Sequence, residues 1–361
     1  MKVRVNSIGK YFFDRFEYLL ISVVLPVSWL VFEKYFYFVS RKNSFLPPVK
    51  NRFKSATIYV HDTNYIIPAQ HSLLALKSAT SWARSTLKIM DVKISSNSTD
   101  IDSEVVIITG DWFKSTKPHL KLFIPAFKLA RKIKKQNLPI WFLAGDTYNL
   151  HLTIAASILV SRCGGAVVLQ QNTRDEALGF GIPFPSGPHL WLFNPDNIYL
   201  FQSEIKWEDR ENLILFAATG DDKRRNFLDQ SKDYLTNLGW TVVPGNQQFD
   251  WVGYRDLNKK TNINVTLSLR KSAVEKRLRF LKNRASEFTV SSRVFEGFCS
   301  GSVVVTNVNP VLSVLGFESG VHYLDVTLMQ NPNFSLPNND LLKSIAISGN
   351  ELFLSIINNK V

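Results

Sequence analysis

Apolar runs alternate with mixed segments of helical length over most of the chain, starting near Ser55. Strands of a parallel sheet that are buried on both faces read as continuous apolar runs, whereas the helices that cover them show mixed periodicity. In the first half, this pattern predicts strands at residues 56–60, 105–109, 140–144, 166–170 and 199–202, and helices at residues 72–86, 117–135 and 150–163.

A second series of the same kind begins at Asn212. It predicts strands at residues 213–217, 241–243, 264–269, 303–305 and 321–324, a helix at residues 224–238 that stops at Gly239, and a terminal helix at residues 339–358. We therefore predict an α/β protein with two Rossmann-like domains, residues 55–203 and 204–338, followed by a C-terminal helical segment, residues 339–361. Ligands of open parallel sheets bind beyond the carboxyl ends of the strands, so two such domains that face each other would enclose a central cleft.

The first 54 residues depart from this pattern. They carry ten Lys or Arg against Asp14, Glu17 and Glu33, a balance of +7 out of the chain's net +13. Within this basic N-terminal arm, residues 18–32 (YLLISVVLPVSWLVF) form an uncharged apolar run. As a helix this run reaches about 22 Å, against about 30 Å for the hydrocarbon core of a bilayer.

Three interpretations of the arm remain open. Basic residues flank the run on both sides, which favours a helix that lies in a membrane surface over one that spans it. A buried helix of the core is the second interpretation, and a spanning segment extended through Glu33 and Lys34 is the third. No small-residue cleavage site follows the run, which argues against a removable secretory signal.

The chain contains two cysteines, Cys163 and Cys299, too few for a disulfide framework or a cysteine metal site. This usage fits a reducing compartment, so we expect a cytoplasmic protein, with attachment to the inner face of a membrane as an option. The Asp-x-Asp segment Asp100-Ile101-Asp102 lies in a polar loop ahead of a strand rather than after one. We interpret it as surface and expect no metal cofactor.

The segment from Ser291 to Asp325 combines a polar helix start, a small-residue turn and a buried strand. Ser291 or Ser292 is placed to cap a helix with Arg293 in its first turn and Glu296 in its second. A helix N-terminus beside an Arg attracts a diphosphate, and a carboxylate one turn further along is placed to accept the hydroxyls of a ribose. An ordinary αβ unit with a capped helix explains the same residues equally well.

The same segment resembles a known family. RVFEGFCSGSVVVTN followed by VHYLD is similar to the donor-site segment of group 1 glycosyltransferases of the GT-B fold, particularly the CgeB-like branch. That branch has the pattern Arg-x-Phe-Glu-x-x-x-x-Gly before an apolar strand, which Arg293, Phe295, Glu296 and Gly301 match. The resemblance implies that Glu296 holds the ribose of a nucleotide sugar and that the turn around Ser300 and Gly301 lies near this donor.

One position departs from the family pattern. Many retaining members carry a second Glu eight positions before the ribose Glu, where this chain has Phe288, with Glu287 beside it. The role of that second Glu is therefore unassigned here. The resemblance covers residues 212–325 and is only general in the first half.

The loop AATGDDKRR after the first strand of the second series combines the Gly220 turn with cations that open a helix. Cations at a helix N-terminus are unfavourable unless an anion is bound. The resemblance also indicates a bound anion here, because it implies that Arg224 or Arg225 contacts the donor diphosphate. A solvated charge run is the alternative.

In the first half, polar residues that follow strands are the candidates for acceptor chemistry. An inverting transferase needs a base near the acceptor hydroxyl, and His61 and Asp146 follow strands at such positions. Turn or capping roles explain both residues as well. With Arg293 they form the predicted catalytic set.

We thus expect a metal-independent glycosyltransferase that moves a sugar from a nucleotide sugar to a glycan or lipid-linked acceptor. Two alternatives remain: a non-catalytic relative that binds sugar nucleotides or glycans, and a basic adaptor for membranes or nucleic acids. Nucleic acid is the less favoured partner, because the basic clusters, such as residues 270–284, have no interleaved platform of aromatic residues on which bases could stack.

Overall fold

The structure is a computed structural model, and it describes residues 53–59, 69–95, 101–109, 129, 131–144, 165–169, 193, 197–216, 222–244, 251–266, 290–329 and 335–359. The chain divides into two compact units. The first comprises Met1–Gln170, Arg174–Trp191 and Lys271–Ser286, and the second comprises Gln171–Thr173, Leu192–Arg270 and Glu287–Val361.

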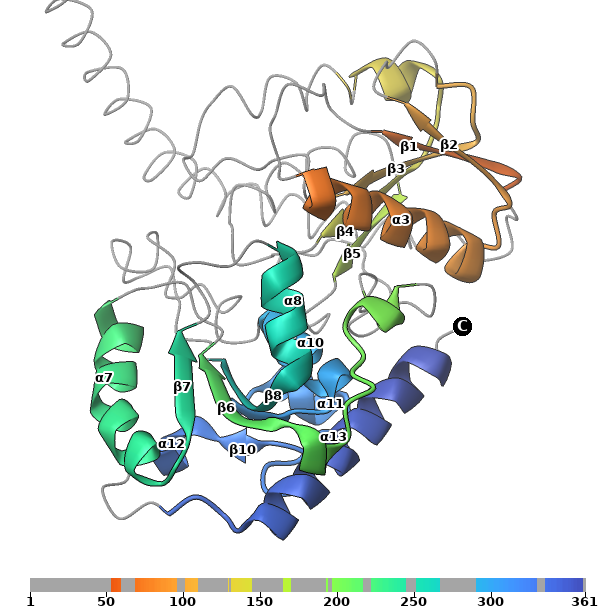
Figure 1. Ribbon diagram of the computed structural model, residues 1–361. Helices are drawn as coiled ribbons and strands as arrows, with labels where there is room; N and C mark the ends of the chain where they lie inside the picture. The colour runs from red at the N-terminus through yellow and green to blue at the C-terminus, as the bar shows by residue number, and fades with distance from the viewer. Residues whose placement is uncertain are drawn as a thin grey trace, which may run out of the picture. The chain divides into compact units, whose positions relative to one another are not determined.

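The first unit is built on a five-stranded sheet (Figure 1). All of its strand pairs are parallel, and the strand order is β2-β1-β3-β4-β5. The strands are β1 (Ser55–Tyr59), β2 (Asp91–Ser95), β3 (Val105–Thr109), β4 (Ile140–Ala144) and β5 (Gly165–Leu169). Every residue of β3 is buried, as a continuous apolar run in the middle of a covered parallel sheet should be.

Helix α3 (Ala69–Thr86) packs against β1, β2 and β3. Its Trp82 ring lies 5.5 Å from that of Trp141 on β4. The sequence predicted β1, β3, β4, β5 and α3 to within a few residues. It missed β2, an exposed edge strand whose DVKIS sequence lacks an apolar run.

The second unit is built on another five-stranded parallel sheet, with the order β10-β9-β8-β6-β7. Its strands are β6 (Glu211–Phe216), β7 (Thr241–Pro244), β8 (Thr261–Thr266), β9 (Val303–Thr306) and β10 (Leu324–Asp325). Helices α7 (Asp222–Asn237), α8 (Trp251–Lys260), α10 (Ser292–Ser300), α11 (Pro310–Val314), α12 (Val326–Met329) and α13 (Asn339–Asn359) complete it.

The two sheets share one topology. Counted within each unit, the order is second, first, third, fourth and fifth strand, so the winding direction reverses between the first and third strands. In open parallel sheets a ligand binds beyond the carboxyl ends of the strands at this reversal. The predicted α/β class with two Rossmann-like halves agrees with this topology, and in the second unit the reversal lies between β6 and β8.

Helices cover both faces of the second sheet, as Figure 1 shows for α7 and α8 on either side of β6 and β7. Leu235 of α7 packs with Ile214 and Phe216, whereas Tyr254 of α8 packs with Leu215. Because adjacent residues of a strand point to opposite faces, α7 and α8 cover opposite faces.

The C-terminal helix belongs to this second unit. The start of α13 contributes Leu342, Ile345 and Ala346 to the cluster on the α7 face. Further along, the ring of Phe353 stacks on Phe295 of α10, at 6.2 Å between centroids. The predicted terminal helix is thus confirmed as an element.

Three predictions for the connecting segments need correction. Residues 199–202 are not a strand, because Ile198–Leu200 form a 3-10 helix, η4. Helix α8 was missed, because Lys260 ends it and Thr261 begins β8 without a Gly or Pro between them. Strand β8 accordingly begins three residues before its predicted start. The connecting segment around the 3-10 helix η5 (Trp207–Asp209) is tied into the second unit, because Trp207 donates to Asn339 of α13 at 3.0 Å.

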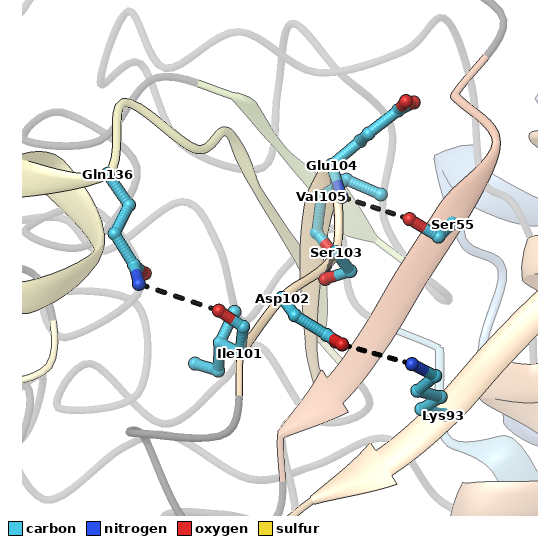
Figure 2. Close-up of polar contacts among 8 residues, drawn as sticks. All are labelled: Ser55, Lys93, Ile101, Asp102, Ser103, Glu104, Val105 and Gln136. Atoms are coloured by element: carbon cyan, nitrogen blue, oxygen red, sulfur yellow. Dashed lines mark hydrogen bonds and ion pairs between the residues drawn. The ribbon is translucent and has the colours of Figure 1, made fainter.

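In the loop before β3, the exposed residues Asp102 and Glu104 alternate with the buried residues Ile101 and Ser103 (Figure 2). Asp102 forms an ion pair with Lys93 of β2 at 3.1 Å, and the Asp102 side chain is 68% exposed. This pair raises the pKa of Lys93 and lowers the pKa of Asp102, mainly through their hydrogen bond. For Asp102, the surface interpretation of the Asp-x-Asp segment is confirmed.

The basic arm, residues 1–52, lies outside the described residues. Among the helices that the structure describes, none combines the length and the apolar character that a membrane crossing requires. The three interpretations of the arm stay predictions.

Candidate functional site

Helix α10 lies at the centre of the candidate site. The side chain of Ser291 accepts a hydrogen bond from the Arg293 backbone N–H, so Ser291 is the N-cap that the sequence proposed. Helix α10 connects β8 to β9, and these strands are parallel, so its N-terminus lies at the carboxyl ends of the strands. Arg293 and Glu296 are therefore carried at the end of the sheet where ligands of this topology bind.

The side chains of Arg293 and Glu296 both contact one residue of α8, Tyr254. The hydroxyl of Tyr254 donates to Glu296 Oε2 at 2.9 Å, and the Arg293 guanidinium lies 5.5 Å from the centre of the Tyr254 ring. Burial, and next the negative charge of Glu296, raise the pKa of Tyr254 well above 10, so its hydroxyl stays protonated and donates. The structure thus brings a cation and a carboxylate together around one buried phenol.

Glu296 itself is buried, with an exposed fraction of 5%. A buried carboxylate is stable only with charge or hydrogen-bond compensation, which Tyr254 partly provides. The sequence suggested a carboxylate that is open to a ribose. The side chain is instead buried, which is the main difference between expectation and structure at this site.

A buried polar network continues from Tyr254 between α8, α10 and β8. The Asn258 amide approaches the Tyr254 hydroxyl at 3.5 Å, and Asn258 Oδ1 accepts from Asn264 at 3.3 Å and from Ser300 at 2.9 Å. The Ser300 hydroxyl also lies 2.9 Å from that of Ser302. Buried polar groups that are hydrogen-bonded in this way hold their elements in one arrangement.

This network follows from the alternation of β8, TNINVT. Ile263 and Val265 belong to the apolar cluster of the other face, while Asn262, Asn264 and Thr266 alternate with them and are also buried. A strand in the middle of a covered sheet normally has apolar residues on both faces. The polar side chains of β8 on the face toward α8 and α10 depart from this pattern, and Asn264 takes part in the buried polar network.

Gly297 lets α10 approach the sheet closely. A Cβ at this position would lie 2.9 Å from Val304 Cγ2 and 3.3 Å from the Asn264 side chain. Only glycine fits there without a shift of the helix or of its neighbours. The position of Arg293 and Glu296 relative to the strands thus depends on Gly297.

Ser300 and Gly301 lie at the opposite end of α10. Gly301 is left-handed, with φ of 69°, and the Ser302 and Gly301 amides donate to Gly297 and Phe298 in a Schellman motif. These residues precede β9, at the amino ends of the strands, and Ser300 is 1% exposed. The topology places them one helix length from Arg293, and their predicted contact with a donor stays a prediction.

Arg210 stabilises that opposite end, and the sequence did not suggest this role. Its guanidinium donates to the carbonyl oxygens of Thr261, Ser300 and Gly301 at 3.0, 2.7 and 2.8 Å, and to that of Ile205 at 3.3 Å. Desolvation lowers the pKa of Arg210 to about 10, so it remains a cation at neutral pH. A cation at the C-terminus of α10 also interacts favourably with the helix dipole.

An unpaired hydroxyl lies at the carboxyl end of β9. Thr306 is the last residue of this strand and pairs in register with Thr266 of β8 and Asp325 of β10. Its Oγ1 is buried and has no hydrogen-bond partner. No predicted site included Thr306, although its place at a strand end is visible in the sequence VVVT.

The other predicted site residues are less well described. Arg224 and Arg225 lie in the first turn of α7, which follows β6, but their side chains are outside the described part. Gly220, His61 and Asp146 lie outside the described residues altogether. Across the described ranges no group of three or more His, Cys, Asp or Glu side chains is arranged to hold a metal ion.

Comparisons with known proteins were made by family, by sequence and by structure. No family model and no curated protein matches this chain. Anabaena Alr3699/HepE in complex with UDP and glucose is a similar solved structure, with a TM-score of 0.48, 10% identity, and coverage of 85% of this chain and 98% of that chain. A glycosyltransferase from Rickettsia africae ESF-5 has a TM-score of 0.38 and 11% identity, and covers 86% of this chain and 96% of its own. AviGT4, a glycosyltransferase involved in avilamycin A biosynthesis, has a TM-score of 0.38 and 10% identity, with coverage of 85% and 96%.

Proposed function

We propose that this protein is a glycosyltransferase of the GT-B type, related to the CgeB-like branch, and that its second unit binds the nucleotide sugar. The observation that carries the proposal is the meeting of Arg293 and Glu296 on Tyr254, at the N-terminus of α10 and the carboxyl ends of β8 and β9. A helix N-terminus and an Arg bind a diphosphate, and a carboxylate accepts hydroxyl groups of a ribose.

In this proposal, the protein promotes sugar transfer by neutralising the negative charge of the leaving diphosphate. As the bond between sugar and diphosphate breaks, negative charge grows on the leaving group, and Arg293, Arg224 or Arg225 and the helix dipoles stabilise it. His61 or Asp146 would act as the base toward a glycan or lipid-linked acceptor bound mainly by the first unit. Donor binding would need no metal, because cations of the protein itself neutralise the diphosphate.

The burial of Glu296 favours a second candidate role for this residue. With an exposed fraction of 5% and a hydrogen bond from Tyr254, the carboxylate fits a structural part of the α8–α10 interface. Donor binding would then depend on Arg293 and the end of the helix. In that case the protein fits the non-catalytic alternative, a relative that binds sugar nucleotides without transferring the sugar.

Calorimetry with UDP, GDP, ADP and CMP, followed by the matching nucleotide sugars, tests the proposal. We expect one of them to bind the wild-type chain, and we expect Glu296→Ala to weaken this binding by about tenfold or more while the fold stays intact. Arg293→Ala should lower turnover more than donor affinity, because the charge it stabilises develops in the transition state. Unchanged affinity in Glu296→Ala would assign this residue to the structural role.

Lys206→Ala is the matched control, because Lys206 is exposed and lies before β6. It removes a cation without touching α8 or α10, so affinity and turnover should not change. Slow hydrolysis of the donor without acceptor would separate an enzyme from a non-catalytic relative. Absence of binding by every nucleotide and nucleotide sugar would remove the proposal.

We also propose that the basic arm, residues 1–54, attaches the protein to the cytoplasmic face of a membrane. The support is its charge of +7 and its short apolar run. Sedimentation with vesicles that contain anionic lipid, for the full chain and for a chain that begins at Ser55, tests this. Equal binding by both chains would contradict it.

A further inference from the structure

Tyr254 is joined to both charged residues of the candidate site, although it belongs to a different helix. Its hydroxyl donates to Glu296 at 2.9 Å, its ring lies under Arg293 at 5.5 Å, and only 7% of the residue is exposed. No sequence motif pointed to α8, and the motif Arg-x-Phe-Glu-x-x-x-x-Gly quoted for α10 does not include it.

The surroundings of Tyr254 restrict its motion. Its ring packs with Leu215 of β6 and with the partly buried Val243 and Leu257. Beyond the hydroxyl lies Asn258, which is itself held by Ser300 and Asn264. Because α8, α10 and the strands β6, β7 and β8 supply these contacts, the phenol is fixed relative to the sheet and not only to α10.

We propose that Tyr254 is a positioning residue, which fixes the Glu296 carboxylate through its hydroxyl and the Arg293 guanidinium through its ring, and so sets the geometry in which unit 2 binds a nucleoside diphosphate. This inference rests on the proposed function. It assigns to α8 a role in recognition beside that of α10, because Tyr254 of α8 contacts the side chains of both Arg293 and Glu296.

The elevated pKa of the phenol is consistent with this role. At neutral pH the hydroxyl donates, and a phenolate would repel Glu296. The donor to Glu296 is therefore present at neutral pH, where a nucleoside diphosphate is charged.

Tyr254→Phe is the direct test, since it removes the hydroxyl and keeps the ring. With the nucleoside diphosphate that binds the wild-type chain most tightly, we expect calorimetry to show about tenfold weaker binding, the loss typical of a hydrogen bond to a charged group. Tyr234→Phe is the matched control, because Tyr234 lies on α7 and is 39% exposed. Its affinity should equal that of the wild type.

A double-mutant cycle separates positioning from a merely structural contribution. If Tyr254 acts through Glu296, then Tyr254→Phe combined with Glu296→Gln should bind no more weakly than Glu296→Gln alone. Additive losses would overturn the inference. So would unchanged affinity in Tyr254→Phe alongside a loss in Glu296→Ala.

The same cycle remains informative if Tyr254→Phe does not fold because Glu296 has lost its donor. The double variant has no charge at residue 296, so it is compared directly with Glu296→Gln; equal affinities support the inference and a further loss overturns it. Failure of the proposed function gives a different pattern, in which the wild-type chain binds none of the nucleotides, and the inference falls with it.

Discussion

The two ends of α10 each have an arginine, and the two arginines are placed for different purposes. At the C-terminus, Arg210 is held by four carbonyl oxygens, from Ile205, Thr261, Ser300 and Gly301. At the N-terminus, Arg293 lies over the Tyr254 ring, beside the carboxylate of Glu296. Arg210 closes off hydrogen-bonding groups of the chain itself, whereas Arg293 brings charge to the end of the sheet where a ligand can bind.

In this short helix, the C-terminus contributes to stability and the N-terminus carries the residues proposed for recognition. The C-terminal carbonyls of α10 are satisfied by the Schellman motif, by Arg210 and by the Asn350 amide, which reaches Phe298 O at 2.7 Å and Cys299 O at 3.2 Å. A fully satisfied end is rigid. The other end is thereby held at a defined height above the strands, where Arg293 and Glu296 act.

Replacement of Arg210 should lower the free energy of unfolding of the second unit more than the other substitutions at α10. Arg210→Met removes the guanidinium donors to the four carbonyl oxygens, and we expect a loss of about 3 kcal/mol in the free energy of unfolding of the second unit. Urea denaturation followed by circular dichroism measures it. Lys206→Met, which removes an exposed cation from the same segment, is the control and should change little. Equal stability of the two variants would contradict the capping role of Arg210.

Gly297→Ala tests whether the close packing of α10 against the sheet affects both stability and nucleotide binding. The new Cβ would lie 2.9 Å from Val304 Cγ2, so α10 or β9 must shift, at a cost of about 1–3 kcal/mol that the better helix propensity of Ala only partly offsets. We expect lower thermal stability together with weaker nucleotide binding. Ser344→Ala, at an exposed position of α13, is the control. A stabilised variant would show that the close approach is not needed.

The smallest change in the free energy of unfolding is expected at Ser291, the N-cap of α10. Ser291→Ala removes the oxygen that accepts from the Arg293 N–H at 3.4 Å, and should cost about 1 kcal/mol in the free energy of unfolding. Chemical denaturation of this variant is compared with that of Ser313→Ala, at an exposed position inside α11 that caps nothing. A loss as large as that of Arg210→Met would mean that the two ends of α10 are equally structural.

Local sequence signals were sufficient for most of the regular elements. The apolar runs of β3, β4 and β9, the cap at Ser291 and the stop at Gly301 depend on nearest neighbours, so the chain alone predicted them. Helix α8 and strand β2 were missed for local reasons too. The first meets β8 without a breaker, and the second is a polar edge strand.

The site was only partly predictable. Arg293 and Glu296 stood out because they are one turn apart on a capped helix. Tyr254 and Arg210 did not, because their partners lie 42 and about 90 positions away in the chain. Ser300 and Gly301 adjoin Glu296 in sequence, but the nine residues of α10 place them at the amino ends of the strands, whereas Arg293 lies at the carboxyl ends.

Periodicity and capping are properties of neighbouring residues, so the amino-acid sequence was enough to predict the α/β class, most of the strands and the helix that carries Arg293 and Glu296. The reversal of winding between the first and third strands of each sheet, the burial of Glu296 and the contacts of Tyr254 and Arg210 with the two ends of α10 became visible in the folded structure. These features arise from contacts between segments far apart in the chain, which local patterns do not encode.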